Sequence, residues 1–143
     1  MTLEKAIDIA TQAHQGQVDK YGAPYIGHVM RVMNMGRTEE EKICGVLHDV
    51  VEDTDWTFER LASVGFGPDI IAALRCVTKE SESEDYDHFV QRTLQNRLAC
   101  LVKLNDLTDN MDVRRMPEVT SKDIARLNKY LRAYRKIAAA VSK

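Results

Sequence analysis

The chain has 143 residues, of which 44% are hydrophobic and 29% are charged, and its formal net charge is −2 at neutral pH. This length and apolar content predict one domain over residues 1–143 with its own hydrophobic core. The charge excludes a strongly basic nucleic-acid binder, and the absence of any run of roughly 18 apolar residues argues against a membrane protein.

The N-terminus and the cysteines both indicate the cytoplasm. Charged side chains at Glu4, Lys5 and Asp8 interrupt the apolar run that a signal peptide would need. The cysteines form no Cys-x-x-Cys pair, and each lies among apolar neighbours. They are Cys44, Cys76 and Cys100. We therefore expect reduced thiols in the core of a cytoplasmic protein.

Apolar residues at helical spacing predict two helices in the first quarter of the chain. One begins after Thr2 and ends near His14, and the other covers residues 25–35. The glycine-rich and proline-containing loop between them allows the backbone to approach a ligand closely. The second helix contains His28, and a lone histidine in such a helix is more often a core side chain than a ligand.

Residues 47–55 hold five ionisable side chains within an otherwise apolar stretch. They are His48, Asp49, Glu52, Asp53 and Asp55. We expect one helix over residues 43–53, started by a capping box at Thr38, in which the Glu-Asp pair lies about one turn beyond the His-Asp pair. The cluster is either a metal site or a solvated helix end. Acids at a helix C-terminus oppose the helix dipole, which favours the metal site.

Further helix signals follow along the rest of the chain. Thr57 caps a short helix, Pro68 starts the next, and Ser81 with Glu84 predicts a second capping box. No strand-like alternation is present, so we predict an all-α bundle of about six to eight helices.

The expected C-terminal helix, residues 121–141, carries a regular apolar stripe. Its members are Ile124, Leu127, Leu131, Tyr134, Ala138 and Val141. Such a stripe packs on its own domain more often than it forms a dimer interface, and the choice between monomer and homo-oligomer stays open. The basic residues between them predict a solvated face. These are Arg126, Lys129, Arg132, Arg135 and Lys136.

Side chains that bind divalent metals occur on three of the predicted helices. The candidates are His28, His48, Asp49 and Asp106. Two imidazoles and two carboxylates without a thiolate suit Mn²⁺, Fe²⁺, Mg²⁺ or Zn²⁺. Four protein ligands leave positions of an octahedral ion open for water and substrate, so this pattern is typical of a catalytic site.

Other polar residues complete the predicted site. Glu52 or Asp53 would hold or deprotonate the attacking water. Lys20 and Lys103 would receive substrate oxygens, and Asn110 shares a helix face with Asp106.

Four motifs carry a resemblance to a known family. They are His14-x-Gly16-Gln17-x-x-Lys20-x-Gly22-x-Pro24-Tyr25-x-x-His28, Leu47 to Thr54, Val77-Thr78-Lys79, and Val102-Lys103-Leu104-x-Asp106-x-x-x-Asn110. Over residues 6–112 the chain resembles the HD-domain metal-dependent phosphohydrolases and, more closely, the hydrolase domain of the Rel/Spo-type alarmone enzymes of the stringent response.

The resemblance implies an all-α fold, a cofactor and a set of site residues. It implies Mn²⁺, with other divalent ions as alternatives, held by His28, His48, Asp49 and Asp106. It assigns Glu52, Asp53 and Asn110 to catalysis, and Lys20, Tyr25 and Lys103 to substrate binding. The implied reaction is hydrolysis of the 3′-pyrophosphate of (p)ppGpp, giving GDP or GTP and pyrophosphate, by a small stand-alone hydrolase.

Three positions depart from the family pattern. Asp19 stands where members usually carry an arginine that contacts the purine base, Leu107 replaces another arginine, and Val113 replaces a threonine. The substrate is therefore expected to be (p)ppGpp or a relative such as (p)ppApp.

Two alternatives to this activity stay open. One is a phosphatase acting on another phosphorylated nucleotide such as NADPH, and the other is a non-catalytic module that binds alarmones or neutralises a toxin. Glu52 and Asp53 favour an enzyme over pure binding, because two extra carboxylates would repel a phosphate. The partner expected for the hydrolase is a small nucleotide substrate, with no nucleic acid and no membrane.

Overall fold

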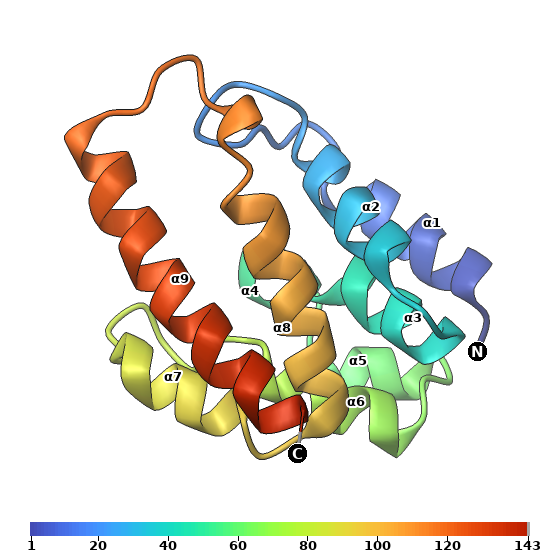
Figure 1. The fold of residues 1–143 in the computed structure, drawn as a ribbon. Coiled ribbons are helices and arrows are strands. Elements are labelled where there is room, and N and C mark those ends of the chain that lie inside the picture. The colour runs from blue at the N-terminus through green and yellow to red at the C-terminus, as the bar shows by residue number, and fades with distance from the viewer. Residues whose placement is uncertain (143) are drawn as a thin grey trace.

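The computed structural model describes residues 1–142, and its regular structure is helical, so the predicted all-α class is confirmed (Figure 1). The elements are α1 (Leu3–Ala13), α2 (Tyr25–Met35), α3 (Glu39–Leu47), α4 (Val50–Asp53), α5 (Phe58–Ser63), α6 (Pro68–Cys76), α7 (Tyr86–Thr93), α8 (Arg97–Asn110), the 3₁₀ helix η1 (Val113–Arg115) and α9 (Ser121–Val141). Lys143, the last residue of the expected domain, lies outside the described residues. Within residues 1–142, no helix combines the length and apolar character needed to cross a membrane.

Side-chain caps determine where most helices begin. In each capped helix a side-chain oxygen accepts a hydrogen bond from the backbone N–H three residues later. The capping residues are Thr2, Thr38, Thr57, Asp85, Asn96 and Thr120. The capping box expected at Ser81 is wrong, because Asp85 supplies the cap and α7 begins at Tyr86. The C-terminal helix has the expected bounds.

The helix predicted over residues 43–53 is divided, which is why nine α-helices are present in residues 1–142 rather than eight. α3 ends at Leu47, and a new single-turn helix, α4, begins at Val50. The backbone at Asp49 leaves the helical region, with φ −107° and ψ 1°. Consecutive residues of a regular helix diverge by about 100°. The break removes that constraint and brings the side chains of His48 and Asp49 to the same point.

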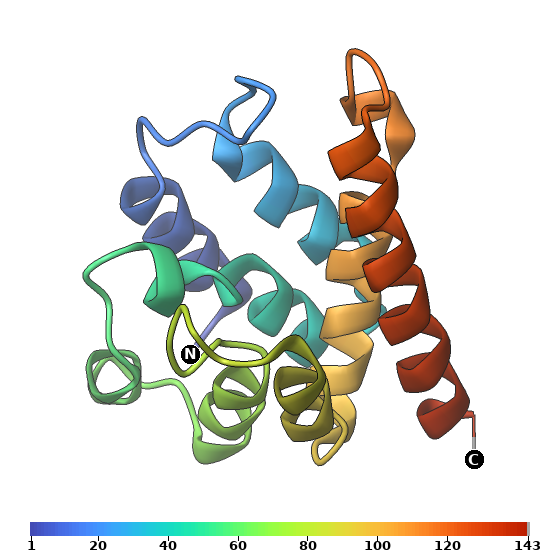
Figure 2. The same ribbon diagram turned by 90° about the vertical axis from the view of Figure 1, so that its left-hand side faces the viewer.

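Helix α8 crosses the middle of the bundle and packs against α2, α3, α6, α7 and α9 (Figures 1 and 2). The larger core lies among α1, α2, α3 and α6 and includes Val29, Leu47 and Leu74. A smaller core between α8 and α9 contains Leu107 and Ile137. The three cysteines are free, as expected, with Cys44 and Cys100 buried.

The apolar stripe predicted for α9 is only partly covered. α9 lies along α8 and buries Ala133 and Ile137, which belong to a neighbouring face of the helix. Ile124 and Leu131 are 53% and 41% exposed. The stripe prediction was wrong in register because α8 covers one edge of α9 and leaves the opposite edge to solvent.

Candidate metal centre and substrate cavity

The four predicted metal ligands converge on one point, although they come from α2, the α3–α4 junction and α8. Asp106 Oδ1 lies 3.0 Å from His28 Nε2 and 3.2 Å from His48 Nε2. Asp49 Oδ2 lies 3.0 Å from His48 Nε2 and 3.7 Å from His28 Nε2. His28 and His48 are both about 2% exposed. Four donor atoms therefore face one another in a region of the fold with little solvent exposure.

The hydrogen bonds at Nδ1 of both imidazoles direct their Nε2 atoms toward Asp106, at the point where an ion would bind. His28 Nδ1 donates to Asp109 Oδ2 at 2.6 Å, and His48 Nδ1 donates to the Gly45 carbonyl at 2.6 Å. Metal-binding histidines are oriented in this way by a partner on the second nitrogen. An ion with bonds of about 2.1 Å and ligands at right angles places neighbouring donor atoms about 3 Å apart, close to the spacing observed. The donor set therefore fits a divalent cation.

The electrostatics of the cluster favour an added positive charge. Burial lowers the pKa of His48, but Asp49 and Asp106 outweigh that effect and hold the pKa well above its usual value. For His28, the hydrogen bonds to Asp106 and Asp109 likewise overcome burial and raise the pKa. The acidic groups therefore favour a positive charge at this point, such as a proton or a metal cation.

Three predicted site residues orient the carboxylates of the centre. The Tyr25 hydroxyl donates to Asp49 Oδ2 at 2.5 Å. Asn110 Nδ2 donates to Asp106 Oδ1 at 3.1 Å, and Lys103 Nζ donates to Asp106 Oδ2 at 3.0 Å. Lys103 is only 8% exposed, and its buried ammonium group forms an ion pair with Asp106.

The predicted acid pair lies at the edge of the centre. Glu52, Asp53 and Asp49 each offer a carboxylate oxygen within 4.8 Å of the others. Glu52 Oε1 also accepts a hydrogen bond from the backbone N–H of Lys79 at 3.1 Å. Burial, followed by the charges of Asp49 and Glu52, raises the pKa of Asp53 to about 6. A carboxylate with this pKa is suited to exchanging a proton near neutral pH.

A cavity of about 190 Å³ opens directly onto the centre. Its wall includes the expected residues Tyr25, Asp49, Glu52, Lys103, Asp106 and Asn110. It also includes side chains that sequence reasoning missed, namely Lys79, Tyr86, Phe89, Lys129 and Tyr130. Lys129 belongs to the face of α9 that was expected to be solvated, and that part of the expectation was wrong. A second cavity of about 640 Å³ shares Glu52 and Lys79 with the first.

The loop between α1 and α2 places its two charged residues differently. Lys20 is exposed and does not line the smaller cavity. Partial burial and the nearby cations Arg126 and Arg115 lower its pKa. The Asp19 carboxylate is 7% exposed and pairs with Arg115 at 3.0 Å. Asp19 thus stabilises the loop, because its other oxygen accepts hydrogen bonds from two loop amides.

The other two departures from the family pattern lie in different environments. Leu107 is fully buried in the core between α8 and α9, where a guanidinium group would have no solvent. Val113 is 50% exposed on η1 and does not line the smaller cavity.

Asp109 is an important residue that was not predicted. It is 4% exposed and carries the hydrogen bond that orients His28. Arg31 Nε donates to its other oxygen at 2.7 Å, and Arg115 Nη1 donates to Oδ2 at 3.0 Å. Its position three residues after Asp106, on the same face of α8, was the available signal.

Comparisons with known proteins give a consistent result, although no protein-family model matches the chain. A protein of Aquifex aeolicus named guanosine-3′,5′-bis(diphosphate) 3′-pyrophosphohydrolase is 30% identical over 120 residues, which cover 76% of this chain and 17% of that protein. A protein of Vibrio cholerae with the same name is 32% identical over 123 residues, with the same coverage. The chain therefore spans less than a fifth of the length of these relatives.

A solved structure has a similar fold, and the similarity covers most of both chains. It is described as a metazoan orthologue of SpoT that hydrolyses ppGpp and plays a role in starvation responses. The TM-score is 0.73 at 27% identity, and the match covers 97% of this chain and 84% of that one. By sequence and by fold, the chain is therefore similar to the Rel/Spo-type (p)ppGpp hydrolases.

Proposed function

We propose that this chain is a metal-dependent pyrophosphohydrolase that removes the 3′-pyrophosphate of (p)ppGpp or of a related alarmone such as (p)ppApp. The observation that carries the proposal is the convergence of His28, His48, Asp49 and Asp106 beside a cavity that also contains lysines. The names of the relatives and of the structural neighbour support the same reaction.

The four convergent side chains would hold the ion, and Mn²⁺ is the ion we propose. Imidazole nitrogens and carboxylate oxygens without a thiolate suit a borderline divalent cation. Once bound, such an ion supplies positive charge that polarises a phosphoryl group and makes water more acidic. Tyr25 and Asn110 fix the orientation of Asp49 and Asp106, which keeps the donor atoms in place.

Glu52 and Asp53 are proposed to position the attacking water and to accept its proton. Both lie beside Asp49 and border the larger cavity, and burial with the nearby acids raises the pKa of Asp53 to about 6. Lys79, Lys103 and Lys129 surround the smaller cavity and provide the charge that phosphate oxygens require.

An adenine alarmone is a specific second candidate. Because Asp19 is tied to Arg115 and to its own loop, the loop offers no guanidinium to the purine at this position. Recognition of the substrate then depends on its phosphates more than on its base, so we propose comparable turnover of ppGpp and ppApp.

The test is a panel of ppGpp, ppApp and NADPH incubated with Mn²⁺ and either wild-type protein or His48→Ala. We expect release of pyrophosphate from the first two nucleotides by the wild type and none by the variant. Phosphate release from NADPH alone would replace the proposed substrate. Turnover that persists in His48→Ala would refute the metal mechanism, and tight binding without turnover of any nucleotide would favour a binding module.

A further inference from the structure

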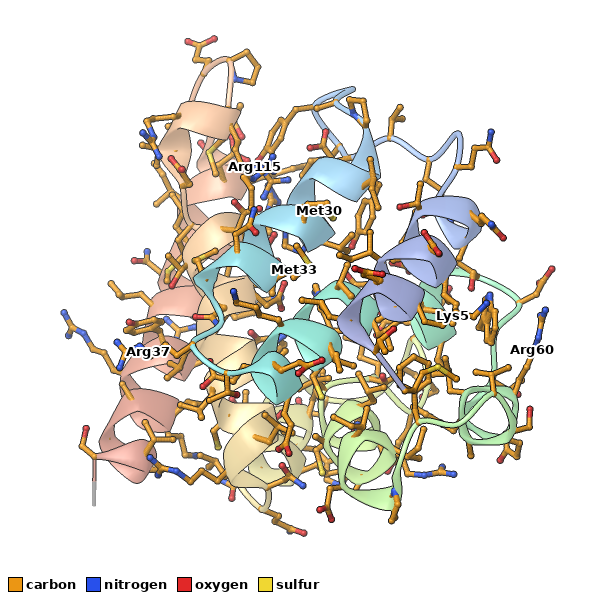
Figure 3. The ribbon with its side chains drawn as sticks, turned by 90° about the vertical axis from the view of Figure 1, so that its right-hand side faces the viewer. Lys5, Met30, Met33, Arg37, Arg60 and Arg115 are labelled. Atoms are coloured by element: carbon orange, nitrogen blue, oxygen red, sulfur yellow. The ribbon has the colours of Figure 1, made fainter. Side chains whose placement is uncertain are left out.

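Arg115 joins three acidic or amide side chains around the metal centre. Its Nη1 donates to Asp109 Oδ2 at 3.0 Å, to the Asp109 carbonyl at 3.1 Å and to Asn110 Oδ1 at 3.3 Å. Its Nη2 donates to Asp19 Oδ2 at 3.0 Å. The Arg115 side chain is 16% exposed, and Figure 3 shows it beside the N-terminal part of α2. One guanidinium group therefore connects η1, α8 and the loop before α2.

Asp19, at one end of this connection, organises the loop that carries Lys20. Its Oδ1 accepts hydrogen bonds from the backbone N–H groups of Tyr21 at 2.9 Å and Ala23 at 3.0 Å. The backbone of Asp19 also donates to the Ala23 carbonyl at 2.8 Å. The conformation of residues 19–23 therefore depends on how the Asp19 carboxylate is held.

Asp109, at the other end, orients a metal ligand. It accepts the hydrogen bond from His28 Nδ1 and so directs His28 Nε2 toward Asp106 and Asp49. Arg31 and Arg115 both bind Asp109, but Arg31 has no hydrogen bond to the loop. Both arginines therefore bind Asp109, but only Arg115 of the two also binds Asp19 in the loop.

We propose that Arg115 is a positioning residue that couples the order of the loop over residues 14–24 to cation binding at His28, through Asp109. A guanidinium group suits this role because its planar fork of donors can bind two carboxylates at once, whereas the single ammonium of a lysine cannot hold both in fixed geometry. Coupling of this kind is reciprocal: an ordered loop favours the ion, and the bound ion favours the ordered loop. The inference rests on the metal site of the proposed function.

Amide hydrogen exchange followed by mass spectrometry tests the coupling without any nucleotide. The readout is exchange of the Tyr21 and Ala23 amides with and without Mn²⁺, beside Mn²⁺ affinity from titration calorimetry. In the wild type, Mn²⁺ should slow loop exchange, and in Arg115→Ala that slowing should disappear while the affinity falls on the order of 5-fold. Arg31→Ala should also weaken Mn²⁺ binding but keep the slowing.

Two further variants distinguish loss of coupling from loss of folding. Asp19→Asn retains an oxygen for the two loop amides but loses the ion pair, so it should reproduce a smaller part of the Arg115→Ala effect. Arg114→Ala removes a neighbouring exposed arginine that pairs with Asp112, and it should behave as the wild type.

The outcomes also separate this inference from the proposed function. Full Mn²⁺-dependent slowing in Arg115→Ala, or equal loss of slowing in Arg31→Ala, overturns the coupling while the metal site stands. Coupling observed in a protein that hydrolyses no nucleotide supports the inference and refutes only the proposed activity. A wild-type protein that binds no Mn²⁺ overturns both.

Discussion

Two clusters of histidine and acidic side chains show what separates a metal site from a group of ligand-type residues. The central cluster, His28, His48 and Asp49, and the α7 cluster, Glu80, Glu84 and His88, each offer donor atoms within 4.8 Å of one another. In the central cluster the histidines are buried and the Nδ1 atoms are bonded outward. In the α7 cluster the His88 side chain is 58% exposed.

The α7 cluster already contains its own cation. Arg92 donates from Nε to Glu84 Oε2 at 2.8 Å and from Nη2 to Glu84 Oε1 at 2.9 Å, and it lies 3.3 Å from Glu80. A metal would have to displace a guanidinium that also binds two backbone carbonyl groups. The comparison teaches that donor atoms facing one buried point, with no arginine already bound among them, indicate a metal centre more reliably than ligand spacing alone.

Removing a central ligand should have the largest effect on metal binding. His48→Ala and Asp106→Ala should each weaken Mn²⁺ binding by more than about 100-fold and abolish turnover, because loss of a mere supporting partner already costs about 10–100-fold. Titration calorimetry with Mn²⁺ measures this. The matched change in the α7 cluster, His88→Ala, should leave Mn²⁺ affinity unchanged. Equal losses in both clusters would break the distinction between them.

Glu52→Gln should separate chemistry from metal binding within the central region. The variant keeps the volume of the side chain but loses its capacity as a base, so kcat should fall by about 10²–10⁴-fold while Mn²⁺ content stays the same. Pyrophosphate release and metal analysis of the same sample measure both quantities. Glu59→Gln, on the exposed surface of α5, is the control and should retain full activity. A Glu52 variant with normal kcat would remove this residue from the reaction.

Asp109→Asn should weaken the hydrogen bond that orients the His28 imidazole. The amide group can no longer accept the histidine proton as strongly as a carboxylate, so Mn²⁺ affinity should fall by about 10–100-fold with the four ligands intact. Calorimetric titration checks the size of the loss, and Asp87→Asn, an exposed position on α7, serves as its control. An unchanged affinity would show that the orientation of His28 is fixed by packing alone.

Glu84→Gln should affect stability and leave Mn²⁺ binding alone. Hydrogen bonds from Arg92 are the main reason that the pKa of Glu84 is lowered from 4.5 to about 2. A carboxyl group whose pKa is lowered by folding stabilises the folded state at pH values above its unfolded-state pKa. This contribution is lost as the pH falls from about 4.5 toward 2. The variant should therefore cost about 1.5–3 kcal/mol at pH 7 and less at pH 3.5. Urea unfolding at both pH values measures the difference, and a constant cost would contradict the ion pair.

Much of the site was predictable because its signals are local. The four ligands and the acid pair were found from residue type and spacing, and the structure brings His28, His48, Asp49 and Asp106 to one point. The C-terminal helix was predicted with its bounds from its apolar spacing, and in the structure Thr120 and Asp123 form a complete capping box at its start.

Other features could not be predicted because they depend on contacts between distant residues. The break at Asp49 divides α3 from α4, and regular helical spacing does not signal it. Lys79 reaches the cavity from the segment between α6 and α7, and Lys129 reaches it from α9. The pair between Asp19 and Arg115 joins residues 96 positions apart.

The sequence by itself determined which groups are present: the metal-binding side chains, the acid pair and the helix caps, because each acts through residues near it in the chain. Only the tertiary structure decided how these groups are used. The direction of His28 Nε2, the pKa of Asp53 and the interactions that hold Asp19 and Asp109 all arise from burial and from partners on other elements. Electrostatic interactions depend on distance and solvent exposure, which residue order alone does not specify.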